Sequence, residues 1–158
     1  MSDDAIRTAA RILSRQTIAS LGTLHAGEPA VSMVPFAATG GALVIHVSRL
    51  ASHTADMLAH PRVAVMIVEG ESNDVMPQAR ARVSVSGDAA RLADGSPEQE
   101  EARLAYLARF PDAAPIFELG DFSLVAIRPR SVRVIGGFGR ASTLSPEQFA
   151  AALGGESS

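Results

Sequence analysis

The sequence predicts an α+β fold in which helices surround a small antiparallel β-barrel. Three observations indicate this fold class. Short strand-like segments follow one another along the chain and are joined by turns that contain glycine. Helix-like segments lie at the periphery, without the regular strand–helix alternation that a parallel sheet would require. The length of 158 residues suits one domain with a sizeable core, which we assign to 1–158.

The first half of the chain is expected to begin with a helix and to continue as strands. Asp3 and Asp4 favour a helix start, and apolar residues then recur on one face of a helix over 1–16. Strands are expected over 18–24, 29–38 and 43–47. Pro35 lies within the second strand, and because proline cannot donate to a β-ladder it marks an edge, a bulge or a ligand-facing break. A short amphipathic helix is expected over 51–60.

The second half is expected to contain four more strands and two helices. The strands are expected over 63–68, 79–92, 122–127 and 132–135, the last two forming a pair around 128–130. Gly87 is predicted to form a bulge in the longest strand. Both helices begin with Ser-Pro-Glu-Gln, in which serine caps the helix and glutamine supports the cap. The second of them opens a short C-terminal helix and tail over 145–158, whose last residues we expect to be frayed.

Composition and charge exclude several classes of protein. The formal net charge is −3 and there is no basic run, so a nucleic-acid partner has little support. The absence of cysteine excludes disulfides, thiolate zinc sites and cysteine nucleophiles. No apolar run approaches membrane-spanning length, and the acidic N-terminus is unlike a signal peptide. We therefore expect a soluble, cytoplasmic protein with no nucleic-acid and no membrane partner.

The segment 43–61 contains the clearest candidate binding site. A strand-like run ends at Ser48 and leads into a helix start that is rich in hydroxyl groups. Helix N-termini present unpaired N–H groups and the positive end of the helix dipole. Arg49 could add a fixed positive charge, and Ser52 and Thr54 further hydroxyl groups, all of which suit a phosphate. The alternative is an ordinary helix cap beside an exposed arginine.

Other catalytic or metal chemistry has weak support in the sequence. There are four histidines, His25, His46, His53 and His60. They lack the cysteine or carboxylate partners of a tetrahedral site, so we expect no metal. No nucleophile elbow or Ser/His/Asp order is found, and the glycine-rich run 136–139 lacks the full dinucleotide-binding pattern. The residues alone therefore assign no catalytic side chain, and an enzyme of this sequence would depend on a cofactor.

Several motifs, taken together and in order, resemble the pyridoxamine 5′-phosphate oxidase-like FMN-binding split barrels, most closely the subgroup related to haem-utilisation proteins. The motifs include Ser32-Met33-Val34-Pro35-Phe36, Ser48-x-Leu50-x-x-His53-Thr54, Arg82-Val83-Ser84-Val85-Ser86-Gly87 and Gly136-Gly137-Phe138-Gly139-Arg140. The resemblance covers nearly the whole chain. It implies a six-stranded antiparallel split β-barrel that forms a homodimer, with FMN in grooves at the subunit interface. Two strongly apolar strands also favour a homodimer, because they would expose apolar surface in a monomer.

The resemblance also implies which residues would contact the flavin. Met33, Val34 and Pro35 would border the isoalloxazine ring, largely through main-chain atoms, and Arg82 would approach it. The ribityl phosphate would be held by residues around the strand-to-helix connection, namely Val47, Ser48, Arg49, Ser52, His53 and Thr54. The primary interpretation is therefore an FMN-binding flavoprotein, an oxidoreductase that acts on an unidentified small molecule.

Departures from the family pattern define the alternatives. The oxidase has an Arg-Lys pair where this chain has Ser52-His53, and its C-terminal substrate-binding residues have no counterpart, so vitamin B6 oxidation is not expected. The first alternative is a haem-binding or haem-degrading protein that uses the same dimer groove. No histidine beyond residue 60 offers an axial ligand for haem. The second alternative is a cofactor-free dimeric binding module.

Overall fold

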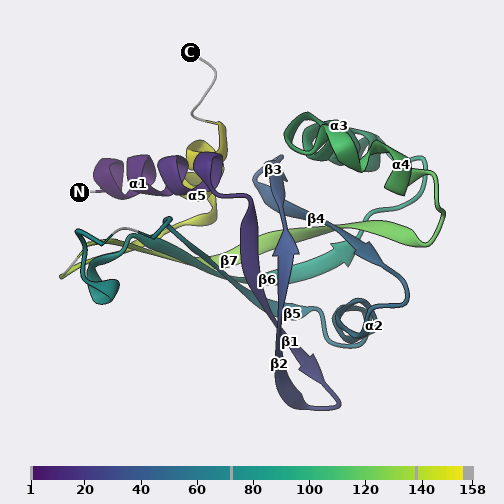
Figure 1. Cartoon of the computed structure of the whole chain (residues 1–158), viewed down its shortest axis with the longest axis horizontal. Coiled ribbons are helices and arrows are strands. Elements are labelled where there is room, and N and C mark those ends of the chain that lie inside the picture. The colour runs from purple at the N-terminus through teal and green to yellow at the C-terminus, as the bar shows by residue number, and fades with distance from the viewer. Residues whose placement is uncertain (1, 72, 138, 155–158) are drawn as a thin grey trace.

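One curled antiparallel β-sheet occupies the centre of the molecule, and helices lie at its ends and edges (Figure 1). The computed structural model describes residues 2–71, 73–137 and 139–154. The strands are β1 (Ile18–His25), β2 (Glu28–Pro35), β3 (Ala37–Thr39), β4 (Ala42–Ser48), β5 (Arg62–Val68), β6 (Arg82–Arg91), β7 (Phe122–Gly137) and β8 (Arg140–Leu144). The α-helices are α1 (Ser2–Arg15), α2 (Ser52–Ala59), α3 (Pro97–Arg109), α4 (Ala114–Phe117) and α5 (Pro146–Gly154). Two short 3-10 helices are η1 (Pro77–Ala79) and η2 (Pro111–Ala113).

The strand order is β2-β1-β5-β6-β7-β4-β3, and β8 pairs with β7. The structure confirms the α+β class and the antiparallel pairing, but the described sheet has eight strands rather than the six predicted. Two features account for the difference. The predicted strand over 29–38 breaks after Pro35, so that β3 becomes a separate short strand. The chain after β7 returns as the additional strand β8. Phe138 between them and the 155–158 tail lie outside the described residues.

The predicted strand pair around 128–130 is wrong, because β7 is one continuous strand. The β6–β7 register explains its continuity. Ser86 pairs with Ser131 and Gly87 pairs with Pro129, so Arg130 is an extra residue on β7 without a partner. The register shift lies at Gly87, where a bulge was predicted, but the extra residue of the bulge is on β7 and not on β6. A Cβ atom on Gly87 would collide with the carbonyl oxygen of Arg128, so glycine is required by this close approach.

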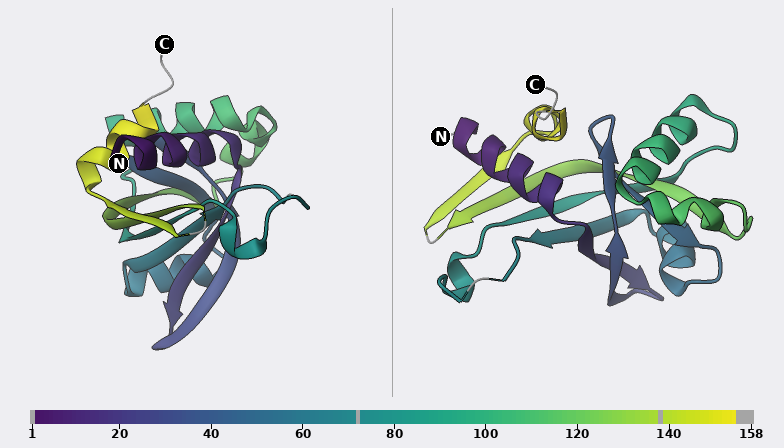
Figure 2. Two further views of the ribbon diagram at one scale, coloured as in Figure 1. Left: turned by 90° about the vertical axis from the view of Figure 1, so that its left-hand side faces the viewer. Right: turned by 45° about the horizontal axis from the view of Figure 1, so that its top comes forward.

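The main core lies between the inner face of the sheet and the helices α1 and α5. Its largest fully buried side chains include Ile12, Leu21, Phe36, Ile45, Ile67, Ile127 and Phe149. Figures 1 and 2 show α1 and α5 side by side at one end of the sheet and α3 with α4 at the other. No helix of the described chain is long and apolar enough to span a membrane.

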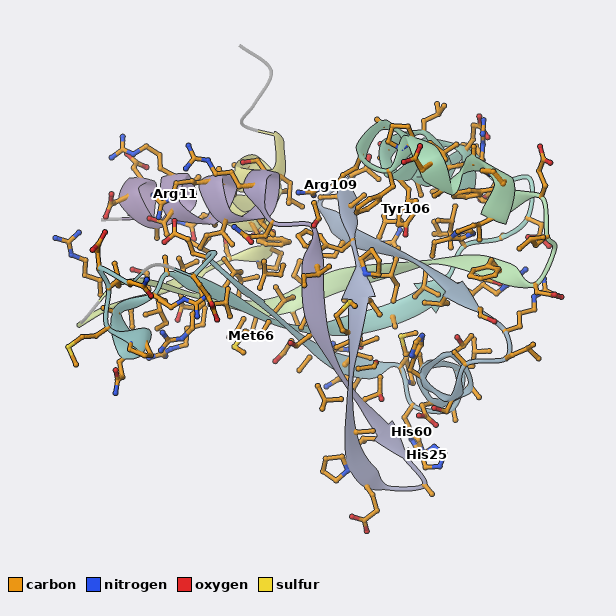
Figure 3. The ribbon with its side chains drawn as sticks, in the orientation of Figure 1. Arg11, His25, His60, Met66, Tyr106 and Arg109 are labelled. Carbon is orange, nitrogen blue, oxygen red and sulfur yellow. The ribbon has the colours of Figure 1, made fainter. Side chains whose placement is uncertain are left out.

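Arg109 at the end of α3 joins the two helical regions (Figure 3). Its guanidinium group donates hydrogen bonds to the carbonyl oxygens of Leu13 at 2.8 Å, of Ser14 at 3.0 Å, and of Gln16. These groups belong to the last turn of α1 and the residue beyond it, where carbonyl oxygens lack helical partners. The same guanidinium lies 4.8 Å from the centre of the Phe36 ring.

The outer face of the sheet is covered in only one of its halves. Over β4 and β7, a second cluster of buried residues packs beneath α3 and α4, with Ala42, Val44, Leu92, Ala102, Leu124 and Ala126 as its members. Over β1, β2 and β5, the same face carries large apolar side chains that remain exposed. Figure 1 shows the β1–β2 hairpin extending away from α1, α3, α4 and α5. The uncovered half therefore presents exposed apolar side chains from three neighbouring strands.

Candidate functional site

Exposed apolar side chains gather on the uncovered half of the outer face. We call them the apolar patch, and its members are Ile18, Val31, Met33 and Met66. The strand register brings them together, because Ser20 pairs with Met33 on one side and with Met66 on the other. Met33 is 64% exposed, and Met66 projects away from α1 and α5 (Figure 3). A patch of this kind is typical of an interaction surface.

A groove of about 420 Å³ lies beside the apolar patch, and we call it the outer groove. It is lined by Gly22, Thr23, Leu24, Pro29, Ala30, Arg62, Val63, Ala64, Ser86, Gly87 and Arg130. Its floor consists of Gly22, Ala64 and Ser86, which lie side by side because Gly22 pairs with Ala64 and Ala64 pairs with Ser86. None of these has a side chain larger than serine, so three neighbouring strands present a flat floor.

Gly22 is the residue on this floor that ordinary packing does not explain. It does not have a positive φ. A Cβ atom built on it would lie 3.5 Å from the carbonyl oxygen of Ala64, which is an ordinary van der Waals contact. Glycine within a strand costs stability, about 0.5–1 kcal/mol relative to alanine. Alanine would fit at position 22 without a clash, and the absence of a side chain there adds to the flatness of the floor.

Two arginines form the charged rim of the outer groove. Arg62 donates from Nε to Oδ1 of Asp88 at 2.9 Å, and Arg130 donates from Nε to Oδ2 at 2.5 Å. The hydrogen bond from Arg130, with further contributions from Arg62, holds the pKa of Asp88 below its usual value. The single carboxylate offsets one of the two positive charges. Because Arg130 is the extra residue of the β7 bulge, the bulge directs this side chain onto the outer face.

Two hydroxyl groups of the predicted phosphate seat, those of Ser48 and Thr54, bond to the backbone of the β4–α2 connection (residues 48–54). Thr54 donates from its hydroxyl to the carbonyl oxygen of Ser48 at 2.5 Å. The hydroxyl oxygen of Ser48 accepts from the backbone N–H of Leu50 at 3.1 Å. The helix cap itself is Ala51, which has no side chain to form a capping hydrogen bond. These hydroxyl groups therefore stabilise the local turn instead of converging on a point in solvent.

The other residues of the phosphate seat differ widely in exposure. Arg49 and Ser52 are exposed, whereas Val47 is buried on the inner face of β4. The backbone N–H of Arg49 donates to the carbonyl oxygen of Asp121 at 2.7 Å. His53 is half-buried, and burial lowers its pKa while the nearby charge of Asp56 opposes that shift.

The remaining predicted flavin contacts lie on two other parts of the sheet. Met33 and Pro35 point to the outer face, whereas Val34 between them is buried on the inner face. Arg82 lies at the opposite end of β6 from the β4–α2 connection, where it donates to the carbonyl oxygens of Gln78 at 3.2 Å and Arg80 at 3.0 Å. Within one chain, the ten predicted residues therefore do not converge on a common point.

The histidines do not assemble into a metal site within the described residues, where no cluster of three or more His, Asp or Glu could hold an ion. His25 and the buried Asp56 form a hydrogen bond of 2.8 Å between Nδ1 and Oδ1. The backbone N–H of His60 donates to the carbonyl oxygen of the same Asp56 at 2.8 Å. The His25–Asp56 bond ties the β1–β2 hairpin to α2, and the bond from His60 closes the C-terminal end of α2 (Figure 3).

The residues of the outer groove were missed in the sequence, although one signal was present. Gly22 interrupts the strand-like run over 18–24, and an isolated glycine in a strand indicates a bulge or a close approach to another group. Ala64 and Ser86 carry no such signal, since small residues are common in strands. Their role depends on the register between β1, β5 and β6.

Comparison with known proteins gives consistent matches over almost the whole chain. A family model described as CREG, beta-barrel matches residues 1–151. The chloroplastic haem oxygenase HOZ of Arabidopsis thaliana is 35% identical over 133 residues, which cover 81% of this chain and 39% of that protein. The haem oxygenase HutZ of Vibrio cholerae is 27% identical over 137 residues, which cover 85% of this chain and 77% of HutZ.

A solved structure extends the comparison to three dimensions. The haem binding protein of Mycobacterium smegmatis superposes with a TM-score of 0.83 at 34% sequence identity, over 93% of this chain and 60% of that one. The chain thus spans well under two thirds of the length of HOZ and somewhat under two thirds of the mycobacterial protein.

These comparisons correct the primary interpretation of the sequence. The named relatives are haem oxygenases and a haem binding protein, so the prediction of an FMN-binding oxidoreductase is wrong. The structure suggests why the sequence misled. The hydroxyl-rich motif that indicated a flavin phosphate seat is used to close the β4–α2 connection.

Proposed function

The chain belongs to the CREG β-barrel family. We propose that it binds haem in the outer groove. The observation that carries the proposal is the flat floor of Gly22, Ala64 and Ser86 beneath two rim arginines. The names of HOZ, HutZ and the mycobacterial protein support haem as the ligand class.

The chemistry of the groove suits the shape and charge of haem. The macrocycle is planar and largely apolar, and a floor without large side chains allows close contact with such a ring. Leu24 and Pro29, which pair across β1 and β2, would pack against its edge. Arg62 and Arg130 would bind the two propionates, because guanidinium groups form charge-assisted hydrogen bonds with carboxylates.

A second copy of the chain would complete the site. The outer groove is open to solvent and would cover one face of a bound macrocycle. The apolar patch beside it is exposed in the single chain. We infer a homodimer in which two patches meet, since self-complementary apolar surfaces are typical of symmetric dimers. Such a dimer would enclose the haem between two outer faces.

The proposal concerns haem binding rather than haem cleavage. Bound haem would supply iron-centred redox chemistry, while this chain would orient the ring and exclude water from one of its faces. No histidine lines the outer groove in the described part of the chain. The cleavage activity in the names of HOZ and HutZ is therefore not extended to this chain.

Titration with haemin tests the proposal. We expect a Soret band to develop at micromolar haemin with one haem per chain or per dimer. Gly22→Val fills the floor of the groove, and it should weaken haem binding by about tenfold to a hundredfold, because overpacking typically costs about 1–3 kcal/mol. The strand itself should tolerate or favour valine.

The matched control is Ala141→Val, which adds a similar side chain at an exposed position of β8 outside the groove. It should leave the haem affinity unchanged. The absence of any haemin-induced spectrum in the wild type contradicts haem binding itself. Equal affinity of wild type and Gly22→Val contradicts the location in the outer groove.

A further inference from the structure

A second cavity, of about 220 Å³, lies between α2 and the strands β6 and β7. We call it the inner pocket. It is lined by Arg49, Thr54, Ala55, Met57, Leu58, Ala89, Arg91, Ser123 and Val125. It shares no residue with the outer groove, and the proposed haem site does not use it.

The body of the inner pocket is apolar. Met57 of α2 faces Ala89 of β6 and Val125 of β7, and all three are buried. Leu58 lies at the rim and is largely exposed. Such walls offer water few hydrogen-bond partners, and apolar cavities of this kind favour apolar ligands.

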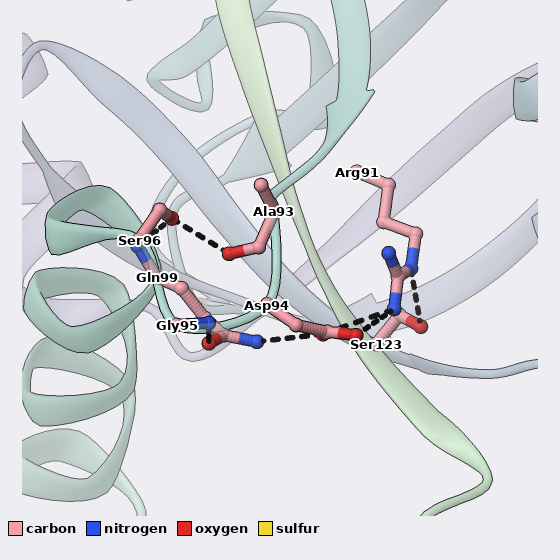
Figure 4. A network of polar contacts seen from close by, with 7 residues as sticks. All are labelled: Arg91, Ala93, Asp94, Gly95, Ser96, Gln99 and Ser123. Carbon is pink, nitrogen blue, oxygen red and sulfur yellow. Dashed lines mark hydrogen bonds and ion pairs between the residues drawn. The ribbon is translucent and has the colours of Figure 1, made fainter.

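The polar end of the pocket has one compensated and one uncompensated arginine. Arg91 donates from Nε to the hydroxyl of Ser123 at 3.1 Å and from a terminal nitrogen to the two carboxylate oxygens of Asp94 at 3.1 and 3.3 Å (Figure 4). Gln99 also donates to Asp94, at 3.2 Å. This network fixes Arg91 and offsets its charge.

Arg49 supplies the uncompensated charge. Among the described residues its guanidinium group forms neither a hydrogen bond nor an ion pair, although its charge contributes to lowering the pKa of Asp94. Arg49 and Arg91 carry two positive charges against the one negative charge of Asp94. The mouth of an apolar pocket thus has a net charge of one positive unit.

We propose that the inner pocket binds a small monocarboxylate with an unbranched alkyl chain. The carboxylate would pair with Arg49, whose planar guanidinium matches its geometry. The alkyl chain would lie against Met57, Leu58 and Val125. The cavity is smaller than pockets for drug-sized ligands, which are roughly 300–1,000 Å³. Its volume therefore limits the length of the ligand's alkyl chain.

A chain-length series tests the pocket with defined probes. Butyrate, hexanoate and octanoate are titrated into the 158-residue chain by calorimetry or by NMR. Affinity should rise by about fourfold for each added methylene until the pocket is full, because a buried methylene contributes about 0.8 kcal/mol. Hexanol, which lacks the charge, should bind about tenfold more weakly than hexanoate, since a hydrogen bond to a charged group contributes about 1.5 kcal/mol or more.

Three variants separate binding in the pocket from non-specific binding. Ala55→Leu fills the pocket from an exposed position of α2 and should abolish hexanoate binding. Ala59→Leu, also exposed on α2 but outside the pocket, is the control and should bind hexanoate as the wild type does. Arg49→Gln should lower hexanoate affinity to that of hexanol and leave hexanol binding unchanged.

Thermal unfolding of each variant establishes that it is folded before it is compared. Equal hexanoate affinity in the wild type and Ala55→Leu overturns the proposal, as does equal affinity for hexanoate and hexanol. The haem site is tested separately, because Gly22→Val should retain hexanoate binding.

Discussion

The two halves of the outer sheet face differ in what covers them. Over β4 and β7, α3 and α4 bury side chains such as Val44 and Leu124. Over β1, β2 and β5, the same face leaves Val31, Met33 and Met66 exposed. The alternation of inward-facing and outward-facing residues along the strands is the same in both halves. It predicts which face of a strand is apolar, but it does not predict what covers that face. The open half is therefore the part of the fold where a ligand and a second chain can contribute to stability.

The largest difference between the halves should appear when the same charge is introduced into each. Val44 is 1% exposed, so Val44→Asp buries an unpaired carboxylate and should lower the free energy of unfolding by about 4 kcal/mol or more. Val31 is 77% exposed, so Val31→Asp should change the free energy of unfolding of the monomer by no more than about 0.5 kcal/mol. Urea unfolding at low protein concentration measures both.

The same pair of variants also tests the proposed dimer. Light scattering should give the mass of a dimer for the wild type and the mass of a monomer for Val31→Asp. A monomeric wild type would contradict the inferred homodimer. Equal destabilisation by the two substitutions would mean that the open half is covered within the chain, contrary to the comparison.

Two glycines on β1 and β6 provide the next contrast. Gly87→Ala forces a Cβ atom against the carbonyl oxygen of Arg128 and should destabilise the fold by about 1–3 kcal/mol. Gly22→Ala meets no such obstacle and should raise the free energy of unfolding by about 0.5–1 kcal/mol. If urea unfolding shows that Gly87→Ala lowers the free energy of unfolding and Gly22→Ala raises it, the result would support a structural role for Gly87 and a ligand-related role for Gly22. A loss of stability in both variants would remove the argument that Gly22 serves the groove.

The sequence predicted the features of this fold that depend on local patterns. Alternation and turn residues identified most strands, and Gly87 indicated the position of the β6–β7 bulge, although the extra residue lies on β7. Pro129 misled, because proline between strand-like runs usually indicates a turn. In the structure it lies in the bulged stretch of β7, where a missing N–H is tolerated. Only the pairing with β6 distinguishes a turn at Pro129 from a bulge within a continuous strand.

The candidate site was less predictable than the fold, for a physical reason. The β4–α2 connection concentrates polar groups within seven residues, and sequence reasoning gave it a ligand that its hydroxyl groups do not require. The outer groove draws Gly22, Ala64 and Ser86 from three strands that are distant in the sequence. The feature that defines the groove is the small size of these three residues. Their small size forms a flat floor only because the strand register places them side by side.

The last contrast concerns the histidine beneath the covered half. His46 of β4 stacks on Phe117 of α4, with ring centres 3.9 Å apart and planes inclined by 10°. Burial lowers the pKa of His46 from 6.5 to about 4. Between these pH values the unfolded chain takes up a proton that the folded chain does not, so stability is fully present above pH 6.5 and falls as the pH decreases toward about 4.

The loss should be about 1–2 kcal/mol, after allowance for the partial exposure of the ring to solvent. His46→Phe retains the stacking on Phe117 and removes the titration, so the difference in free energy of unfolding between wild type and variant should grow as the pH falls below 6.5. Urea unfolding at a series of pH values measures it. A difference that stays constant over this range would mean that His46 takes up a proton in the folded protein as readily as in the unfolded chain. The covered half would then admit water beneath α4. The two halves of the outer face would differ only in how much solvent reaches them.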